Sequence, residues 1–437
     1  MSCAHGLVSN ESIFSIDASS LAFGPGAVAE AGAQLAALGA RRVAVFTDPR
    51  VAKLEPLAVV RASLAAANVD FEVFEDCHVE PKDVYLTDAV AFAREGRFDG
   101  YLSVGGGSAI DTCKLAALYA TYPADLLAYV NAPVGEGRAV PGPLPPHVAC
   151  PTTSGTGSEC TGIAVFDLRE RNIKTAVASR RLRPTLALVD PTFTKTLPSE
   201  VVAASGFDVL CHALESFTAR RFDTRARPAS PGLRPMSQGQ NPWSDLGSRE
   251  ALRLAGTFFV RATLDASDAE ARAGLSWAAT LAGIAFGNAG VHLPHAMSYA
   301  VAGLVRDYRA PGYPDHGPMV PHGVSVIVSA PSVFRATSAT GPARHLEAAA
   351  LLGADVHGAG PDDAGEILGR HIERLMQRTR VPLGLGALGY TGADLDALAR
   401  GAAVQRRLLD NAPMAVDEAR LRELFTGAMR YEGESRS

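Results

Sequence analysis

One short stretch of the chain carries a carboxylate and an imidazole at helical spacing. Residues 206–215 read G-F-D-V-L-C-H-A-L-E, so Asp208 and His212 stand four residues apart. Side chains at positions i and i+4 lie on the same face of a helix, where both can bind one metal ion. One Asp with three His would form a mixed oxygen and nitrogen shell, which suits Fe(II) or Zn(II) better than Mg²⁺ or Ca²⁺. The spacing therefore indicates half of a transition-metal site.

Two further histidines in the same half of the chain could complete such a site. His295 lies in G-V-H-L-P-H-A-M and His322 lies in V-P-H-G, as if entering a turn. The residues alone leave this choice open, because His292 stands three residues before His295 and His316 lies in a neighbouring loop. An isolated Asp-x-x-x-His pair is also common on ordinary helix surfaces.

A run of glycines follows a predicted strand in the first half of the chain. The strand 101–105 leads into Gly105, Gly106, Gly107 and Ser108, and a helix that contains Asp111 follows. Glycines let a pyrophosphate approach the backbone, and a helix N-terminus offers unpaired N–H groups and the positive end of a dipole. The spacing is not G-x-G-x-x-G, so the usual dinucleotide fingerprint is absent. Taken alone, the run is better explained as a tight turn.

A second loop changes that balance. Pro151–Glu159 reads P-T-T-S-G-T-G-S-E, follows the β-rich run His147–Cys150, and offers the hydroxyls of Thr152, Thr153 and Thr156. Such a loop suits phosphates and a nicotinamide carboxamide, although it also fits a polar surface turn. In open α/β folds nucleotides bind at the carboxyl edge of the sheet, where both loops would meet. The pair of loops predicts a nucleotide site.

Asp48 ends the first strand recognised in the sequence and has two interpretations. A carboxylate at this place could bind ribose hydroxyls and repel a 2′-phosphate, which favours NAD over NADP. Asp48 followed by Pro49 is equally typical of a turn.

The alternation of strands and helices over the first 190 residues predicts a mostly parallel, doubly wound α/β sheet. The expected strands are Arg42–Asp48, Phe71–Asp76 and Tyr101–Gly105. The expected helices lie around Gly26–Leu38 and Thr87–Glu95. The second helix should have Thr87 as its N-cap and Gly96 just beyond its end.

The pattern changes near Pro198, after which helical segments rich in Ala, Leu and Arg dominate. The stretch Pro184–Pro198 reads as a last strand followed by a link. We therefore expect an α/β dinucleotide-binding domain over residues 1–197 and an all-α metal-binding and substrate domain over residues 198–437. Within the second, Ala219–Trp243 is a long irregular stretch, and such stretches are often functional.

The overall composition excludes several classes of protein. A formal net charge of −5 without a long basic block argues against nucleic acid or an anionic membrane as a partner. No apolar run reaches the roughly 18 residues that a membrane-spanning helix needs.

The cysteines and the N-terminus bear on the cellular compartment. Six cysteines are scattered without a C-x-x-C pair (Cys3, Cys77, Cys113, Cys150, Cys160 and Cys211), which favours free thiols in a reducing compartment. The first twelve residues lack the features of a secretory signal or a transit peptide. We therefore expect a cytoplasmic protein.

Taken in chain order, these motifs resemble those of iron-containing alcohol dehydrogenases, and the similarity extends over nearly the whole chain. The motifs that carry it are Gly105–Ser108 with Asp111, Pro151–Glu159, Asp208 with His212, His295-x-Met and Pro321-His322-Gly323. The finer detail of S-G-F-D-V-L-C-H-A-L-E-S and F-G-N-A-G-V-H-L-P-H-A-M-S-Y is similar to the branch of the family that moves hydride between hydroxyacids and oxoacids. The resemblance implies the architecture shared with dehydroquinate synthase: an α/β dinucleotide-binding domain and an all-α metal-binding domain.

The resemblance also implies roles for individual residues. The implied metal ligands are Asp208, His212, His295 and His322, which leaves His292 outside the site. Tyr299 stands where many members carry another active-site histidine, so Tyr299 and His295 are the expected catalytic residues. The expected cofactor-binding residues are Asp48, Gly105, Gly106, Gly107, Ser108, Asp111, Thr152, Thr153, Thr156 and Lys174. The implied cofactors are a tightly bound NAD and a divalent metal, with Fe(II) preferred and Zn(II) as the alternative.

The implied reaction converts 4-hydroxybutyrate to succinate semialdehyde while 2-oxoglutarate becomes 2-hydroxyglutarate, with hydride passing through NAD. Both starting substrates carry a carboxylate remote from the reacting carbon, and arginine is the best fixed partner for such a group. The segment Arg220–Arg234 could supply that anchor, or it could be a solvated basic loop. The alternatives are an NAD(P)-dependent iron-containing alcohol dehydrogenase with an exchangeable cofactor and a lyase resembling dehydroquinate synthase. We also expect a homo-oligomer.

Overall fold

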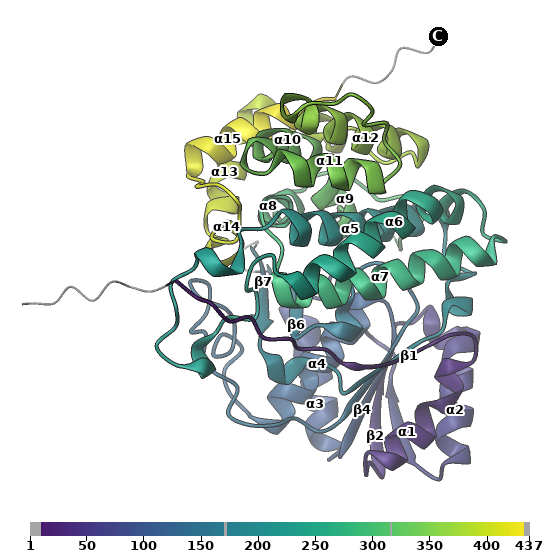
Figure 1. Cartoon of the computed structure of the whole chain (residues 1–437). Coiled ribbons are helices and arrows are strands. Elements are labelled where there is room, and N and C mark those ends of the chain that lie inside the picture. The colour runs from purple at the N-terminus through teal and green to yellow at the C-terminus, as the bar shows by residue number, and fades with distance from the viewer. Residues whose placement is uncertain (1–9, 170–172, 315–316, 432–437) are drawn as a thin grey trace, which may run out of the picture.

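The two halves of the chain fold differently, as Figure 1 shows for the computed structural model. The structure describes residues 10–169, 173–314 and 317–431; Cys3 and His316 lie outside them. The N-terminal half is built on a parallel sheet and the C-terminal half is helical, so the predicted fold class is confirmed. The last strand of the sheet ends at Val189 and the first helix of the second half begins at Ser199. The domain division between residues 197 and 198 stays a prediction.

The sheet of the N-terminal half has six parallel strands in the order β1-β8-β5-β4-β2-β3. Its strands are β1 (Ser20–Phe23), β2 (Arg42–Phe46), β3 (Asp70–Phe74), β4 (Gly100–Gly105), β5 (His147–Pro151) and β8 (Leu186–Val189). All residues of β4, β5 and β8 are buried, as expected for strands covered on both faces.

Helices cover both faces of this sheet. They are α1 (Ala31–Ala37), α2 (Glu55–Ala66), α3 (Asp83–Glu95) and α4 (Gly107–Thr121). On β2, Val43 and Val45 pack in one core cluster with residues of α1 and α2, whereas Ala44 and Phe46 pack in another with residues of α3 and α4. The alternation follows the two-residue period of a strand and confirms the doubly wound arrangement.

Several predicted boundaries are wrong. Helix α3 begins at Asp83, so Thr87 is not its N-cap; the Thr87 hydroxyl instead donates to the Asp83 carbonyl from inside the helix, at 3.5 Å. A threonine can make this i−4 bond, which is why its presence does not by itself mark a helix start. Gly96 is the C-cap, as predicted. The sequence patterns also missed an antiparallel hairpin of β6 (Ile163–Leu168) and β7 (Ile173–Ala178) beside the sheet.

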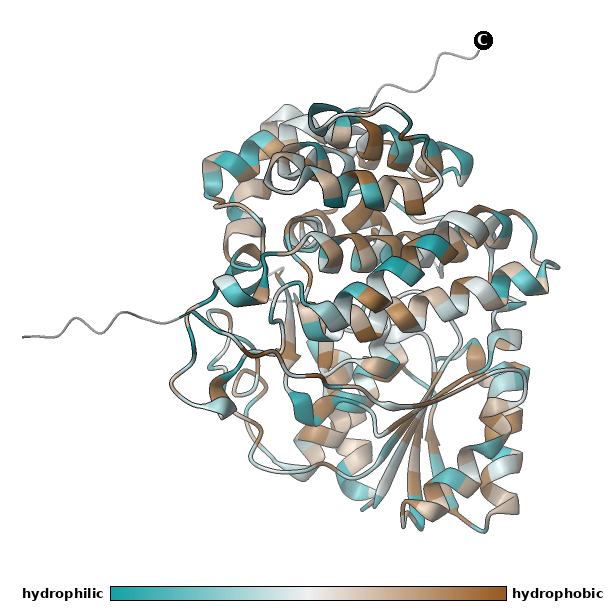
Figure 2. Cartoon of the chain, in the orientation of Figure 1, coloured by the Kyte–Doolittle hydropathy of each residue, from teal (hydrophilic) through white to brown (hydrophobic). Residues whose placement is uncertain are grey.

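The helices of the C-terminal half surround a single large core cluster. They are α5 (Ser199–Thr218), α6 (Pro242–Leu264), α7 (Ala269–Ala289), α8 (Leu293–Gly303), α9 (His322–Ile327), α10 (Ala330–Thr337), α11 (Pro342–Leu351), α12 (Ala364–Arg378), α13 (Leu395–Ala403), α14 (Arg406–Leu409) and α15 (Glu418–Gly427). Figure 2 shows hydrophilic and hydrophobic residues alternating along the outer helices, as expected where only one face is buried. None of the helices in the described residues is long and apolar enough to cross a membrane.

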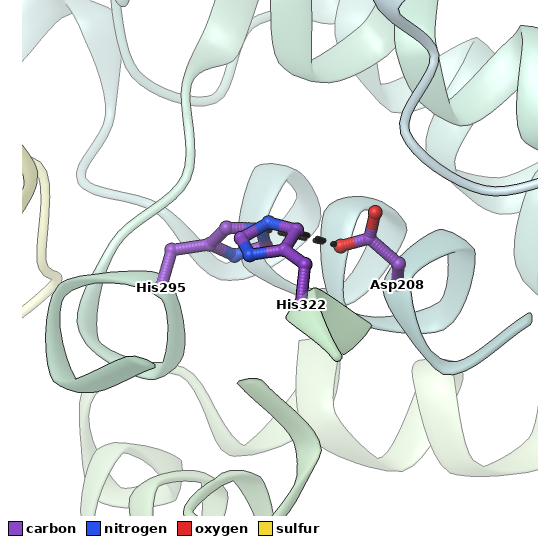
Figure 3. A group of neighbouring side chains, drawn as sticks. All are labelled: Asp208, His295 and His322. Carbon is purple, nitrogen blue, oxygen red and sulfur yellow. Dashed lines mark ion pairs between the residues drawn. The ribbon is translucent and has the colours of Figure 1, made fainter. Parts of the chain in front are cut away.

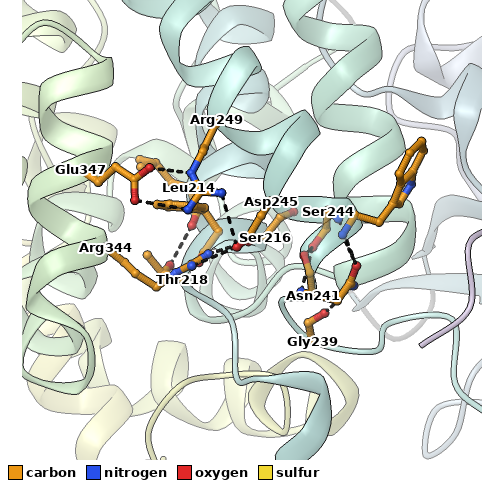
Figure 4. A network of polar contacts seen from close by, with 12 residues as sticks. Leu214, Ser216, Thr218, Gly239, Asn241, Ser244, Asp245, Arg249, Arg344 and Glu347 are labelled. Atoms are coloured by element: carbon orange, nitrogen blue, oxygen red, sulfur yellow. Dashed lines mark hydrogen bonds and ion pairs between the residues drawn. The ribbon is translucent and has the colours of Figure 1, made fainter. Parts of the chain in front are cut away.

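A network of polar contacts fixes the end of α5 against its neighbours (Figure 4). Arg344 on α11 donates to the Phe217 carbonyl at 2.6 Å and to the Asp245 carboxylate on α6 at 2.6 and 3.0 Å. Asn241 caps α6 by accepting from the backbone N–H of Ser244 at 3.0 Å. Because α5 also carries Asp208 and His212, these contacts hold the helix that presents the first candidate ligands.

Candidate functional site

Three histidines surround one carboxylate oxygen in the helical half. The Oδ1 atom of Asp208 lies 3.6 Å from Nε2 of His212, 3.5 Å from Nε2 of His295 and 3.6 Å from Nε2 of His322. Figure 3 shows the side chains of Asp208, His295 and His322 pointing toward one another from three elements, and their ligand atoms all lie within 4.8 Å of each other. The structure thus brings three of the four expected ligands within 4.8 Å of one another and places His212 3.6 Å from Asp208.

The donor atoms of this cluster fit a metal ion better than they fit one another. Asp208 Oδ1 and His295 Nε2 are both buried and, in the described part of the chain, neither has a hydrogen-bond partner. Buried polar atoms without partners are costly and need an explanation. Two ligands about 2.1 Å from a tetrahedral ion would lie about 3.4 Å apart. The separations of 3.5 and 3.6 Å are close to that value.

A glycine lets two of the helices come close enough to build the cluster. A Cβ atom on Gly323, at the start of α9, would lie 1.8 Å from the Ala204 carbonyl oxygen of α5. Only glycine fits that approach, because a backbone oxygen cannot move aside. His322 precedes this glycine and is the first residue of α9, so the close packing carries its imidazole to Asp208.

Glu215 orients His295 and was missed by the sequence analysis. Its Oε1 lies 2.5 Å from Nδ1 of His295, and its Oε2 accepts from the backbone N–H of His292 at 2.6 Å. A carboxylate on one ring nitrogen of histidine leaves the other nitrogen for a metal. Glu215 follows His212 by three residues and is fully buried. The signal in the sequence was its spacing: Glu215 follows Asp208 by seven residues and therefore lies on the same face of the helix.

His292, one of the two alternatives to His295, lies outside the cluster. Its Nδ1 accepts from the backbone N–H of Leu293 at 2.7 Å, and its Nε2 lies 3.0 Å from the Thr218 hydroxyl. Both ring nitrogens are therefore engaged within the protein, and neither is free for a metal.

Burial and charge act against each other on the titratable groups of the cluster. Burial lowers the pKa of His295, but the negative charges of Glu215 and Asp208 and the hydrogen bond to Glu215 raise it to about 9. For His212 burial dominates and lowers the pKa to about 4. Burial would raise the pKa of Asp208, yet the surrounding histidines hold it below its usual value. The carboxylate is therefore ionised, as a metal ligand must be.

The two loops of the N-terminal half meet at the carboxyl edge of the sheet. Strands β4 and β5 are neighbours, and the backbone N–H of Thr152 donates to the Gly105 carbonyl at 2.9 Å. A Cβ atom on Gly106 would lie 3.3 Å from Cγ2 of Thr153. The strand order reverses between β2 and β4, which is the place where open α/β sheets bind nucleotides.

Asp48 follows β2 at this same switch point. Its Oδ1 accepts from the backbone N–H groups of Arg50 and Val51 at 2.9 and 3.0 Å, so its role in the turn is present. Its Oδ2 lies 3.5 Å from the position of a Cβ atom on Gly105, beside the glycine loop. One oxygen thus forms the turn while the other faces the expected nucleotide site. Binding of ribose stays a prediction.

Two residues expected at the cofactor have partners within the protein. Asp111 accepts from the backbone N–H of Val165 at 2.9 Å and from the Ser158 hydroxyl. Lys174 on β7 forms ion pairs with Glu80 at 2.5 Å and with Asp167 at 2.7 Å. The contacts of Asp111 with Val165 and of Lys174 with Glu80 join the hairpin to α4 and to the segment before α3. Contact of Asp111 or Lys174 with a cofactor stays a prediction.

The other hydroxyl-bearing residues of the two loops also take part in local contacts. Ser108, in the first turn of α4, accepts from the backbone N–H of Glu80 at 3.3 Å. The Thr156 hydroxyl accepts from the backbone N–H of Ser158 at 3.2 Å. A Cβ atom on Gly107 would lie 2.6 Å from that hydroxyl oxygen, so the two loops approach each other closely here.

The irregular stretch Ala219–Trp243 is ordered by contacts with distant segments. Four of its five arginines form two groups. Arg221 pairs with Asp223 at 2.5 Å and Arg234 with Glu11 at 3.0 Å, whereas Arg220 and Arg225 line a pocket of about 390 Å³. Tyr299 on α8, four residues after His295, lines an adjoining smaller pocket. Contact of Tyr299 with a substrate stays a prediction.

Curated relatives match nearly the whole chain. It is 47% identical to the mitochondrial hydroxyacid-oxoacid transhydrogenase of Xenopus tropicalis, over 96% of this chain and 91% of that protein. The mitochondrial hydroxyacid-oxoacid transhydrogenase of Homo sapiens is 44% identical, over 95% of this chain and 90% of that protein.

The expectation of a cytoplasmic protein is wrong in the light of these relatives, which are mitochondrial proteins. That expectation rested on the residues at the N-terminus and on free thiols. The five cysteines in the described residues are indeed free and buried (Cys77, Cys113, Cys150, Cys160 and Cys211). Free thiols indicate a reducing environment, but this property does not distinguish one reducing compartment from another.

Family models and solved structures agree with the relatives. Residues 18–191 match the model for iron-containing alcohol dehydrogenase, and residues 236–429 match the C-terminal model of the same family. The crystal structure of 1,3-propanediol oxidoreductase, 28% identical, superposes with a TM-score of 0.83 and covers 95% of this chain and 100% of that one. The glycine and threonine loops at the sheet edge and the Asp208 cluster therefore lie in a shared architecture, and the chain belongs to the iron-containing alcohol dehydrogenase family.

Proposed function

We propose that the protein is a hydroxyacid–oxoacid transhydrogenase. It oxidises 4-hydroxybutyrate to succinate semialdehyde and reduces 2-oxoglutarate to 2-hydroxyglutarate. Hydride and one proton leave the first substrate and are taken up by the second, so NAD is regenerated in each cycle. The relatives that are 44% and 47% identical over nearly the full chain support this choice within the family. The observation that carries the chemistry is the buried Asp208 cluster with its unpartnered donor atoms.

We assign the metal to Asp208, His212, His295 and His322. A bound divalent metal would polarise the substrate's hydroxyl or carbonyl oxygen as a Lewis acid. Fe(II) is the preferred ion, because four protein ligands leave room for substrate only where a fifth ligand is accepted, and structural zinc is almost always four-coordinate. Glu215 would hold the ring of His295 in the orientation that this set requires.

We assign NAD to the carboxyl edge of the sheet. The glycine loop Gly105–Ser108 and the start of α4 offer backbone N–H groups to a pyrophosphate, and Thr152, Thr153 and Thr156 offer hydroxyls. Asp48 would bind the ribose through the oxygen that faces Gly105. We also propose that NAD remains bound to the protein between the two half-reactions.

Tyr299 is assigned to the substrate side of the site. It lies one helical turn after His295 on α8 and is buried, which raises the pKa of its phenol. A phenol with a raised pKa stays protonated at neutral pH and can donate a hydrogen bond to a substrate oxygen. We propose that it positions the substrate for hydride transfer to NAD.

An isotope-transfer experiment tests the proposed function. The purified protein receives 4-hydroxybutyrate deuterated at C4 together with 2-oxoglutarate, with no NAD added, and 2-hydroxyglutarate is examined by mass spectrometry. Deuterium at C2 of the product, with NAD released in stoichiometric amount on denaturation, is expected. A strict requirement for added NAD would instead identify a dehydrogenase with an exchangeable cofactor, which the likeness to 1,3-propanediol oxidoreductase favours.

One further alternative function and the predicted oligomeric state have their own tests. A lyase resembling dehydroquinate synthase would give products with no net oxidation or reduction of the substrate. The predicted homo-oligomer is tested separately by sedimentation equilibrium, where a mass of 45.6 kDa would identify a monomer.

A further inference from the structure

Three arginines from two distant segments line one pocket. Arg220 and Arg225 follow α5 in the sequence, whereas Arg407 lies in α14, near the C-terminal end of the chain. The pocket has a volume of about 390 Å³, and its lining includes Asn131 from the N-terminal half. We call it the arginine pocket.

Part of the hydrogen-bonding capacity of these arginines is unused. Arg225 donates to Asn411 Oδ1 at 2.7 Å and Arg407 donates to the Ser237 hydroxyl at 3.2 Å. The Nε atoms of Arg220 and Arg225 are buried and have no hydrogen-bond partner in the part of the chain that the structure describes. A buried N–H donor without a partner is destabilising, and an anion would supply the missing acceptor.

Neighbouring arginines are neutralised by the protein itself. Arg221, in the same segment, is paired with Asp223 at 2.5 Å, and Arg406, next to Arg407, is paired with Asp410 at 3.3 Å. Asp410 also lines the arginine pocket and is its one carboxylate among the described lining residues. The three pocket arginines themselves have no carboxylate oxygen within 4.0 Å among the described residues. Positive charge therefore exceeds negative charge in this pocket.

The arginine pocket adjoins the smaller pocket that contains Tyr299. The smaller pocket that contains Tyr299 shares two lining residues with it, Asn131 and Arg407. Tyr299 and His295 lie four residues apart on α8 and so share a helical face. Arg407 thus stands at the junction between the pocket of Tyr299 and the arginine pocket.

We propose that Arg407, together with Arg225 and Arg220, binds the substrate carboxylate that is remote from the reacting carbon. The inference rests on the proposed function, and it identifies the residues that select acids over neutral alcohols. A guanidinium presents two parallel N–H donors to a carboxylate, which fixes its orientation as well as its charge. A substrate whose oxygen lies at the Asp208 cluster would extend past Tyr299 and place its distal carboxylate at Arg407.

Binding of glutarate tests this assignment without any turnover. Glutarate has two carboxylates but no group to oxidise or reduce, so its affinity, measured by titration calorimetry, does not depend on hydride transfer. The test variants are Arg407→Gln and Arg225→Gln, and the matched control is Arg221→Gln in the same segment. We expect each test variant to bind glutarate about 10- to 100-fold more weakly than the wild type, because a hydrogen-bonded charge pair is lost. The control should bind normally.

Steady-state kinetics add a readout that a structural role would not give. In the test variants KM for 4-hydroxybutyrate should rise by a similar factor, while kcat/KM for 1,4-butanediol, which has no carboxylate, should stay near the wild-type value. Arg407→Lys keeps the charge but loses the paired donors, so it should lie between the wild type and Arg407→Gln. Thermal denaturation of every variant identifies any that fails to fold, and Arg225→Gln and Arg407→Lys then carry the test.

The outcomes separate this inference from the proposed function. Equal glutarate affinity in Arg407→Gln, Arg225→Gln and Arg221→Gln would overturn the carboxylate site, as would an equal loss of activity toward 1,4-butanediol. Absence of glutarate binding by a wild type that transfers deuterium would also overturn it. Loss of glutarate binding in the test variants, in a protein that does not transfer deuterium, would support the carboxylate site and reject the transhydrogenase.

Discussion

The polar side chains at the two candidate sites, one in each half of the molecule, differ in whether they have hydrogen-bond partners within the protein. At the sheet edge of the N-terminal half, Asp111 is bonded to Ser158 and Val165, and Lys114 donates to Ser158 at 2.5 Å. In the helical half, Asp208 Oδ1 has no hydrogen-bond partner among the described residues, although it is buried. Asp111 and Lys114 are thus bonded within the protein, whereas the metal cluster leaves buried donor atoms without partners.

This difference follows from what each half offers to a ligand. A nucleotide at a strand–helix turn is bound largely by backbone N–H groups, so the nearby side chains serve to hold the loops rigid. A metal has no use for N–H groups and needs lone pairs from side chains that nothing else occupies. Substitutions should therefore separate the two halves cleanly, with metal lost from one and NAD lost from the other.

The largest effect is expected from the shared carboxylate of the metal cluster. Asp208→Ala removes the oxygen that lies 3.5 to 3.6 Å from the three histidines, so metal should be lost and activity should fall by at least about 1000-fold. NAD released on denaturation should stay at the wild-type amount. Metal content by plasma mass spectrometry is the measurement, with the exposed His357→Ala as control. Retained metal in Asp208→Ala would contradict the assignment.

A smaller loss is expected from the carboxylate that orients His295. Glu215→Gln keeps the shape of the side chain but replaces the charged acceptor at His295 Nδ1, and metal affinity should fall about 10- to 100-fold. Excess metal should restore activity, which a misfolded variant would not allow. Competition with a chelator measures the affinity. If Glu215→Gln and the wild type lose metal at the same chelator concentration, Glu215 has no role in orienting His295.

The N-terminal half should show the reverse behaviour. Gly106→Val adds a side chain that faces Thr153, where even a Cβ atom would lie 3.3 Å from Cγ2. Forcing the two loops apart should weaken NAD binding by about tenfold, in line with the cost of overpacking, and leave metal content unchanged. Gly232→Val, at a glycine with nothing within 4 Å, is the control. Equal loss of metal and NAD would show that the two halves are not independent.

The smallest effect concerns stability at acidic pH. His147 lies 2.8 Å from the Ser103 hydroxyl, and burial lowers its pKa to about 3 from a usual value of 6.5. Between these values the unfolded chain binds a proton that the folded chain does not, so the free energy of unfolding falls as pH falls below 6.5. The slope should be about 1.4 kcal/mol per pH unit for this residue.

Urea unfolding at pH 6.0 and pH 4.5 measures that slope. The variant His147→Gln should lose less stability than the wild type between the two pH values, because it has no proton to gain. His357→Ala, which removes an exposed histidine, should follow the wild type. If His147→Gln and the wild type lose the same free energy of unfolding, the buried imidazole is not what makes this half sensitive to acid.

Much of the architecture was predictable because its signals are local. Runs such as Arg42–Phe46 and Gly100–Gly105 are apolar enough to identify buried strands, and the Asp208–His212 spacing identifies one helical face. The hairpin Ile163–Leu168 and Ile173–Ala178 was missed. Its two strands form a separate antiparallel sheet, so they do not follow the strand–helix alternation that revealed the rest.

The choice of His295 over His292 could not be made from spacing. Both lie at the start of α8, but Glu215 of α5 accepts from the backbone of one and contacts the ring of the other. The arginine pocket was equally hidden, because Arg407 lies far along the chain from Arg225 and only packing places them on one cavity.

The fold class, the two loops and one pair of metal ligands could thus be predicted from short stretches of sequence. This is possible because a helix or strand gives its residues a regular spacing that can be recognised locally. The complete ligand set, the open donor atoms and the excess of positive charge in the arginine pocket emerged from packing. Whether a buried polar atom has a partner depends on how several helices pack. The close approach of Gly323 to Ala204, which brings His322 to Asp208, is one example. No local pattern contains that information, because it is a property of distances between elements far apart in the chain.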